Sequence, residues 1–579
     1  MWESLRTVRV YLWRYRRGLA LGLGALVVKD LAGGVQPLVI RAAIDTLSRA
    51  HGLARLLRYA GLLVALAAVK GLFQYWMRVI IIGISRDIEY DLRNDLFRHL
   101  VELSPDYYAR VRTGDIMARA TNDLNAVRMM LGPGIMYWTE TSLTFLLAII
   151  IMVTVDWRLA LLAVLPAPLV SLAVIFFGRA IHARFERIQA MFSDISSRVQ
   201  ENLAGVRMVR AFVQERAEIR RFEELNRGYI AENIRLVRIS GVFQPLLEAL
   251  IGLTFLAVLW YGGGQVLAGR ISLGSFVMFN TYMGMLVWPM IALGWVVNLM
   301  QRGSASLARI NQIFHQEPTI AAPPNPVRLA QVRGEIEFRN ASVAYPSGRA
   351  LDRVSLTIDA GSTLAVVGRT GSGKSTLVSL VPRLMDPTAG RVLLDGVDLR
   401  DLAPADLRRH IGFVPQETFL FSATIAGNIA FGVENAAEDE IRRAAELAGL
   451  AGEIESFPQG YATMVGERGI TLSGGQKQRT AIARALLRNP RILMLDDALS
   501  SVDTLTEERI LEGLEGAMRG RTVILISHRV STVRQADRIV VLEHGCIVEQ
   551  GTHAELVAAG GYYADLWQKQ MLEEELEAI

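Results

Sequence analysis

The sequence predicts an α-helical membrane domain with six spans and long helical extensions, fused in one chain to an α/β domain. A chain of 579 residues exceeds what one hydrophobic core usually supports, so at least two domains are expected. Uncharged runs occupy 159–178, 249–269 and 271–301, and each approaches or exceeds the roughly 20 residues that cross a bilayer. Beyond residue 303 no run comes close, and an apolar strand instead leads into a glycine-rich loop at 362–375.

The hydrophobic runs predict six spans, near 18–44, 56–83, 134–155, 158–179, 244–267 and 272–301. The two long connections, 84–133 and 180–243, carry apolar residues at helical spacing among many charges, so we expect helices that continue past the bilayer. Their arginines place these extensions, and with them both termini, on the cytoplasmic side. We therefore expect an integral membrane protein of a bacterial plasma membrane, surrounded by membrane lipids.

The first 17 residues mix aromatic residues with arginines, which predicts an amphipathic helix at a membrane surface rather than a cleavable signal peptide. Charged residues inside spans are costly, by about 2.5 to 3.5 kcal/mol each at mid-membrane. Either they line a polar substrate path, or some lie near an interface and snorkel or, for Lys29 and Asp30, pair with neighbouring helices; the sequence leaves both interpretations open. The residues concerned are Lys29, Asp30, Lys70, Glu140 and Glu248.

The overall charge and the cysteine count argue against two features, a nucleic-acid partner and an internal disulfide. The net charge of +5 is explained by basic cytoplasmic loops, so a nucleic-acid partner is not expected. The chain has one cysteine, Cys546, so it forms no internal disulfide.

A phosphate-binding loop follows the predicted strand 362–367 and precedes a predicted helix at 376–384. The pattern G-x-x-x-x-G-K-S predicts backbone N–H groups around phosphate oxygens, with Lys374 neutralising the β and γ phosphates and Ser375 binding Mg²⁺. We therefore expect ATP and Mg²⁺ as cofactors. The loop residues expected to contact nucleotide are Gly368, Arg369, Thr370, Gly371, Ser372, Gly373, Lys374, Ser375 and Thr376.

A second apolar strand, 491–495, runs into two aspartates. In a phosphate-loop protein a carboxylate at this point holds Mg²⁺, which is the role predicted for Asp496. Asp497 then faces the attacking water and is a predicted catalytic residue.

The segment Leu472–Gln476, with the sequence LSGGQ, stands between the phosphate loop and the aspartates, and with them it resembles the ATP-binding cassette exporter family. The resemblance extends over nearly the whole chain and is that of a half-transporter. It implies a transmembrane domain at 1–320, a linker at 321–333 and an ATP-binding domain at 334–579. In this family two nucleotide domains meet head to tail, so a second half-transporter is the expected partner. The residues that would cap the partner's ATP are Ser473, Gly474, Gly475 and Gln476.

The resemblance assigns further roles. Tyr345 would stack on adenine, Gln416 would link Mg²⁺ to the membrane helices, and His528 would contact the γ-phosphate, the last two counting as catalytic. Asp503 would communicate across the dimer. The segments expected to join the two domains are Val465–Gly469, Thr113–Asp115, Thr121–Asp123 and Glu201–Phe212.

Asp497 departs from the family pattern, which has glutamate at this position. The charge is the same but the arm is shorter, so we expect ATP to bind well and to be hydrolysed slowly at this site. A heterodimer with a chain that carries the glutamate is favoured, and a homodimer with two slow sites is the alternative.

The expected function is ATP-driven export of amphiphilic drugs, lipids or peptides by alternating access. A regulatory subunit that holds ATP as a clamp and an ATP-gated conductance remain as alternatives. An importer is disfavoured because six spans and the ATPase share one polypeptide.

Overall fold

The computed structural model describes residues 2–48, 53–165, 167–346, 348–466, 472–500 and 504–577. It divides into two compact units. One comprises Met1–Val101 and Thr113–Gln316, and the other comprises Glu102–Arg112 and Glu317–Ile579.

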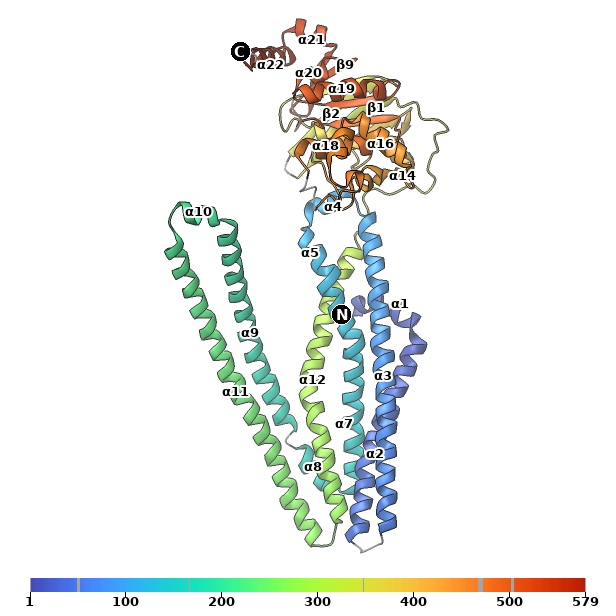
Figure 1. Ribbon diagram of the computed structural model, residues 1–579. Helices are drawn as coiled ribbons and strands as arrows, with labels where there is room; N and C mark the ends of the chain where they lie inside the picture. The colour runs from blue at the N-terminus through green and yellow to red at the C-terminus, as the bar shows by residue number, and fades with distance from the viewer. Residues whose placement is uncertain are drawn as a thin grey trace. The chain divides into compact units, whose positions relative to one another are not determined.

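The first unit is helical, and within the described residues six helical segments are long and apolar enough to cross a membrane. Each overlaps one predicted span, which confirms the six-span fold class. The helices α9 and α11 run side by side and are joined through α10 (Figure 1). The elements are α1 (Trp2–Arg14), α2 (Arg16–Ser48), α3 (Leu53–Glu102), α5 (Thr113–Ala118), η1 (Arg119–Asp123), α6 (Leu124–Met129), η2 (Met130–Gly134), α7 (Ile135–Val155), α8 (Trp157–Val164), α9 (Ala167–Ala204), α10 (Val206–Ala211), α11 (Glu215–Leu267) and α12 (Leu273–Phe314).

The predicted extensions are mainly helical, with breaks at 103–104, 111–112, 205 and 212–214. Helix α3 has 50 residues and α11 has 53. At about 1.5 Å per residue both are more than twice as long as the roughly 30 Å hydrocarbon core of a bilayer requires.

The N-terminal helix α1 packs against the protein with part of its apolar face. Val8 and Tyr11 are buried, and the Tyr11 hydroxyl donates to Asp95 of α3 at 2.7 Å. Just after α1, the Tyr15 hydroxyl donates to Asp91 of α3 at 3.0 Å. The helix thus buries part of one face, and Tyr11 bonds it to α3.

Among the charged residues predicted within spans, Lys29 on α2 forms ion pairs with Asp30 at 2.8 Å and with Glu140 of α7 at 2.5 Å. Lys29 and Asp30 are both buried. The structure thus shows Lys29 paired with a carboxylate of its own helix and with one of a neighbouring helix. Glu248 is exposed and accepts a hydrogen bond from Gln244 of its own helix.

The second unit contains two sheets, which confirms the predicted α/β class. A four-stranded antiparallel sheet has the order β2-β1-β4-β5, and a six-stranded sheet has the order β10-β9-β3-β8-β7-β6. The strands are β1 (Ile336–Tyr345), β2 (Gly348–Ile358), β3 (Thr363–Val367), β4 (Ala389–Leu394), β5 (Val397–Asp398), β6 (Ile411–Val414), β7 (Ile492–Asp496), β8 (Thr522–Ile526), β9 (Arg538–Glu543) and β10 (Cys546–Gly551).

The central strands β3, β7 and β8 of the six-stranded sheet are buried on both faces, whereas the edge strand β10 is partly exposed. Alternate residues of β3 enter different cores: Ala365 and Val367 face one, while Leu364 and Val366 face the other. Both faces are therefore apolar, which is why these strands read in the sequence as unbroken hydrophobic runs.

Helices cover this framework. They are α4 (Pro105–Arg110), α13 (Lys374–Leu380), η3 (Leu399–Asp401), α14 (Pro404–Arg409), α15 (Ile425–Ile429), η4 (Ala430–Gly432), α16 (Glu438–Leu447), α17 (Ala451–Ser456), η5 (Gly460–Ala462), α18 (Gly474–Leu487), α19 (Thr504–Met518), α20 (Val530–Val533), α21 (His553–Ala559) and α22 (Tyr562–Glu577).

Candidate functional site

The carboxyl ends of four neighbouring parallel strands bring the predicted site residues to one sheet edge. The strands β3, β8, β7 and β6 are adjacent and mutually parallel. Gly368 follows β3, His528 follows β8, Asp496 ends β7 and Gln416 follows β6. Residues from widely separated parts of the sequence thus share the edge where open α/β sheets bind ligands.

The phosphate loop needs its glycines for steric reasons. Gly368 has φ 151° and Gly373 has φ 103°, values that favour glycine. A Cβ atom on Gly368 would lie 2.2 Å from the Leu542 carbonyl oxygen, and one on Gly373 would lie 2.4 Å from that of Ala350. The loop therefore packs directly against backbone, and α13 begins immediately after it at Lys374.

Lys374 is buried within the loop. Its Nζ donates to the carbonyl oxygens of Gly368 at 2.8 Å and Arg369 at 2.9 Å. Burial lowers the pKa of the Lys374 ammonium. The negative charges of Asp496 and Asp497 have the opposite, smaller effect and raise this pKa. The ammonium thus lies between the loop and the two carboxylates.

Two observations show that this loop fits a phosphate group. The Ser372 hydroxyl is buried and, within the described residues, has no hydrogen-bond partner, so it can bond to a phosphate oxygen. The first N–H groups of α13 follow a glycine that supplies no side-chain cap. A helix start of this kind favours an anion.

Ser375 of the phosphate loop and Asp496 at the end of β7, both predicted Mg²⁺ ligands, lie next to each other. Asp496 is buried, and it accepts a hydrogen bond from Ser375. Burial raises the pKa of Asp496, against this hydrogen bond, which lowers it. A hydroxyl beside a carboxylate is a donor set that suits Mg²⁺.

The backbone of Asp497 is held from two sides. Its N–H donates to the Ile526 carbonyl at 3.0 Å, and its own carbonyl accepts from the Ser500 hydroxyl at 3.0 Å. The residue has φ 50°, a left-handed conformation that aspartate tolerates better than most residues. The position of its carboxylate is therefore set by side-chain length and rotamer.

Three further predicted residues have exposed side chains. Tyr345 is 41% exposed at the end of β1, and its hydroxyl contacts the Met385 sulfur at 3.5 Å. Gln416 and His528 are exposed. A charge on His528 would lower the pKa of Asp496, so the imidazole lies within electrostatic reach of that carboxylate.

The signature segment forms the start of α18. The Ser473 hydroxyl accepts from the Gln476 N–H at 3.2 Å, and the Gln476 side chain accepts from the Ser473 N–H at 2.9 Å. This reciprocal pair is a capping box. The Gln476 amide also donates to Glu453 at 2.9 Å, and Glu453 forms an ion pair with Arg479 at 2.7 Å.

In the part of the chain that the structure describes, no hydrogen bond or ion pair joins Ser473–Gln476 to the phosphate loop. The chain therefore presents the signature segment and the phosphate loop without a polar contact between them. Asp503 and the Glu467–Gly469 part of Val465–Gly469 lie outside the described residues.

Comparison with known proteins gives the family. The model of the ABC transporter transmembrane region matches residues 19–290, and the ABC transporter model matches residues 351–500. The chain is 37% identical, over 97% of its length and 96% of the relative's, to the probable multidrug resistance ABC transporter ATP-binding/permease protein YheI of Bacillus subtilis. The chain belongs to the ABC transporter family.

Other relatives agree. The chain is 38% identical to the multidrug resistance-like ATP-binding protein MdlA of Escherichia coli, over 98% of this chain and 97% of MdlA. It is 39% identical to an ATP-dependent lipid A-core flippase of Syntrophus aciditrophicus, over 88% of this chain and 84% of the flippase. A solved bacterial Atm1-family ABC exporter with ATP bound superposes with a TM-score of 0.81 at 29% identity, covering 96% of this chain and 99% of the other. The chain is thus an ABC exporter half-transporter, and it couples ATP hydrolysis to transport.

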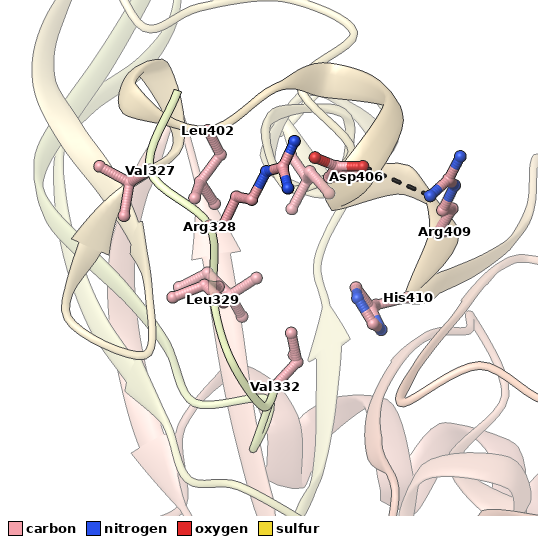
Figure 2. A pocket seen from close by; sticks show the side chains of 10 residues that line it. Val327, Arg328, Leu329, Val332, Leu402, Asp406, Arg409 and His410 are labelled. Carbon is pink, nitrogen blue, oxygen red and sulfur yellow. Dashed lines mark ion pairs between the residues drawn. The ribbon is translucent and has the colours of Figure 1, made fainter. Parts of the chain in front are cut away.

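The nucleotide-binding unit of this ABC exporter has a hollow of about 340 Å³, whose lining is shown in Figure 2. The chain segment Val327–Val332 lines one side of it, and Asp406 and His410 line another. None of the predicted nucleotide residues lines this hollow.

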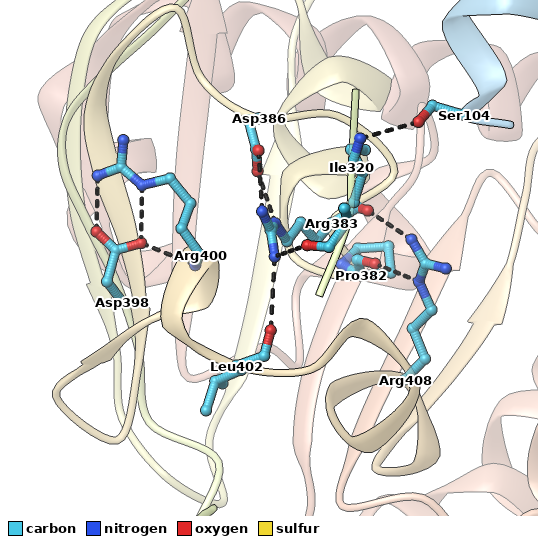
Figure 3. A network of polar contacts seen from close by, with 10 residues as sticks. Ser104, Ile320, Pro382, Arg383, Asp386, Asp398, Arg400, Leu402 and Arg408 are labelled. Carbon is cyan, nitrogen blue, oxygen red and sulfur yellow. Dashed lines mark hydrogen bonds and ion pairs between the residues drawn. The ribbon is translucent and has the colours of Figure 1, made fainter. Parts of the chain in front are cut away.

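The segment that follows α13 is tied to the start of the predicted linker (Figure 3). Arg383 is buried, and it pairs with Asp386 at 2.9 Å and reaches the Ala321 carbonyl at 3.5 Å. The neighbouring Ile320 N–H donates to the Ser104 hydroxyl at 3.0 Å. The beginning of the linker is therefore docked on the ATP-binding unit and on the residue that precedes α4.

From the sequence, no role was predicted for the C-terminal helix α22. The ring of Tyr562 lies 5.7 Å from the guanidinium of Arg369 in the phosphate loop. Halfway along the helix, Gln570 bonds to the backbone on either side of Arg529. Only long-range folding brings these residues together, so local patterns carry no signal for them.

Proposed function

We propose that this chain drives export of amphiphilic substrates by alternating access as one half of a dimer, with both termini cytoplasmic. One observation carries the proposal: within the described residues, no hydrogen bond or ion pair joins the phosphate loop to the signature segment of the same chain. A site that needs both must take the signature segment from a second chain. ATP would then join the two chains, and its hydrolysis would release them.

In this proposal the phosphate loop and Lys374 hold the phosphates, and Tyr345 stacks on adenine. Ser375, Gln416 and Asp496 hold Mg²⁺, which neutralises the charge that develops on the phosphates. Asp497 accepts the proton of the attacking water, and His528 contacts the γ-phosphate. Ser473 and the glycines after it cover the partner's nucleotide, and Asp503 links the two sites.

The same proposal makes this chain's own site slow. Asp497 offers a carboxylate on a shorter arm than the family's glutamate, and its backbone is fixed by Ile526 and Ser500. We therefore favour a heterodimer in which a second chain supplies the glutamate and this chain supplies an intact signature segment. A homodimer with two slow sites is the alternative.

The transported substrates are proposed by class. One relative is named as a multidrug resistance transporter and another as a lipid A-core flippase. Drugs and lipids share an apolar body with a polar end. An amphiphilic cargo is therefore the substrate class that we assign to this chain, and peptides of that character belong to it.

A mixing experiment tests the crossed sites. Lys374→Ala removes phosphate binding but leaves the signature segment, and Ser473→Asp keeps an N-cap on α18 while placing a negative charge against the partner's ATP. Each variant alone should be inactive as an ATPase. A homodimer made from both would contain one intact crossed site, so co-expression should restore activity.

Failure of the mixture, with both variants folded and the wild-type chain active, would contradict crossed sites. A wild-type chain that stays monomeric and inactive with ATP and Mg²⁺ would instead rule out the homodimer and require a different partner. ATP-dependent accumulation of an amphiphilic dye in inside-out vesicles tests transport. ATP hydrolysis without accumulation of any dye or fluorescent lipid would favour the regulatory alternative.

A further inference from the structure

The backbone that carries His528 is held by a side chain from the C-terminal helix. Gln570 of α22 donates through Nε2 to the His528 carbonyl at 2.6 Å. Through Oε1 it accepts from the Val530 N–H, also at 2.6 Å. One amide therefore brackets the backbone on both sides of Arg529.

This contact fills a gap in the local structure. Val530 begins the short helix α20, and Arg529 at the N-cap position supplies no side-chain cap. The first N–H of a helix has no partner within the helix, so an external acceptor is needed. Gln570 supplies it from 40 residues away.

The imidazole of His528 depends on this backbone for its position. His528 is exposed, and within the described residues its ring makes no hydrogen bond. An exposed side chain without bonds of its own is directed by the φ and ψ angles of its residue. A shift of the 528–530 backbone would therefore move the ring relative to Asp496.

The other end of α22 is fixed beside the phosphate loop. The Glu549 carboxylate accepts from the N–H groups of Tyr562 at 2.6 Å and Tyr563 at 3.3 Å, at the start of the helix. The Tyr562 ring lies 5.7 Å from the Arg369 guanidinium, within the range of a cation–π contact. Eight residues, or about 12 Å of helix, separate Tyr562 from Gln570.

We propose that Gln570 is a positioning residue for ATP hydrolysis, which sets the place of His528 by clamping the backbone from 528 to 530. The inference rests on the proposed role of His528 at the γ-phosphate. Only an amide side chain of this length can donate to the carbonyl and accept from the N–H at once. Glutamate keeps the acceptor but cannot donate to the His528 carbonyl.

The experiment uses the full-length chain in lipid nanodiscs with Mg²⁺-ATP, assembled with its partner half-transporter where the active complex is a heterodimer. Gln570→Met keeps the size of the side chain and removes both bonds, and Gln568→Met on an exposed position of the same helix is the matched control. Turnover is read on this chain itself by vanadate trapping of a photoreactive ATP, and KM for ATP is measured in parallel. We expect Gln570→Met to lower kcat about tenfold, with KM changed less than about twofold and the control unchanged.

A second arm separates positioning from general support of the fold. If Gln570 acts through His528, then Gln570→Met has no further effect on turnover in a His528→Ala background. An equal further loss in that background would show a structural role and overturn the inference. A loss with His528→Ala but none with Gln570→Met would overturn the inference alone. Unchanged turnover in His528→Ala would overturn the assigned role of His528 and the inference with it.

Discussion

Replacing Asp497 by glutamate is the sharpest test of the catalytic argument. The backbone at this residue is pinned by hydrogen bonds with Ile526 and Ser500, both at 3.0 Å. It therefore cannot advance to bring a short side chain nearer to the attacking water. A glutamate side chain carries the same charge about 1 Å further from the backbone, toward the attacking water.

The expected gain follows from that distance. A misplacement of about 1 Å costs roughly a hundredfold in rate, which is about 2.7 kcal/mol of activation free energy. This hundredfold factor lies at the lower end of the rate enhancement of roughly 10² to 10⁴ that general-base assistance contributes. We therefore expect Asp497→Glu to raise turnover at this chain's own phosphate loop by up to about a hundredfold. Because φ at this residue is 50°, the longer side chain should also cost some stability, on the order of 1 kcal/mol.

Single-turnover hydrolysis of radiolabelled ATP by the purified chain measures the chemical step without product release. Asp497→Asn serves as the control, because it removes the charge while keeping the length, and it should abolish the remaining activity. Equal single-turnover rates for Asp497→Glu and the wild type would refute the reasoning, since carboxylate reach would then not limit the rate. ATP binding affinity should be unchanged in all three proteins.

Two further predictions follow from ionic contacts. Lys29→Met leaves the carboxylates of Asp30 and Glu140 without their cation, so it should destabilise the membrane domain by about 3 to 5 kcal/mol. Adding Asp30→Asn and Glu140→Gln should restore much of the lost thermal stability in nanodiscs, whereas an unchanged melting temperature in the single variant would contradict the pairing. Despite the opposing effect of burial, hydrogen bonds from Arg479 and Gln476 hold the pKa of Glu453 below its usual value of about 4.3. The ionised Glu453 carboxylate therefore stabilises the fold fully above that pH, and this stabilisation is lost as the pH falls through the folded-state pKa. Glu453→Gln should thus lower the melting temperature at pH 7 but not in acid. An equal decrease in melting temperature at both pH values would contradict the assignment.

The strands that carry the site could be predicted closely. The predicted strands 362–367 and 491–495 correspond to β3 (Thr363–Val367) and β7 (Ile492–Asp496). Their apolar runs are short and end abruptly at glycine or acidic residues, so a local pattern fixes their limits. The helix after the phosphate loop was predicted at 376–384 but spans Lys374–Leu380.

That difference has a physical reason at each end. Gly373, with φ 103°, is the last loop residue, so helical geometry begins directly at Lys374. Pro382 cannot donate a helical hydrogen bond, and Arg383 has φ 50°, so the helix cannot run on to Leu384. The left-handed conformation of Arg383 accompanies its bonds to Asp386 and to the linker, which are tertiary contacts that the local sequence does not encode.

The contacts that hold the catalytic loops were beyond sequence reasoning. The positions of His528 and Ser473 follow from motifs, but Gln570 lies 42 residues from His528 and shows no pattern of its own. Glu453 supports the signature helix from 23 residues away in the same manner. Motifs predict the groups that would meet the nucleotide, whereas the side chains that hold those groups in place are scattered along the sequence.

Each loop at the sheet edge is held in place by a different contact, which we call its anchor. These anchors determine which properties of the site depend on the aspartate at position 497. The phosphate loop rests against the Leu542 carbonyl, the Asp497 backbone is bonded to Ile526, and the His528 backbone is bonded to Gln570. None of these three anchors involves the Asp497 carboxylate. A shorter carboxylate therefore leaves the nucleotide-binding edge intact and lowers only the rate of the step that needs it. The expected outcome is a site that still closes a dimer around ATP while hydrolysing that ATP slowly.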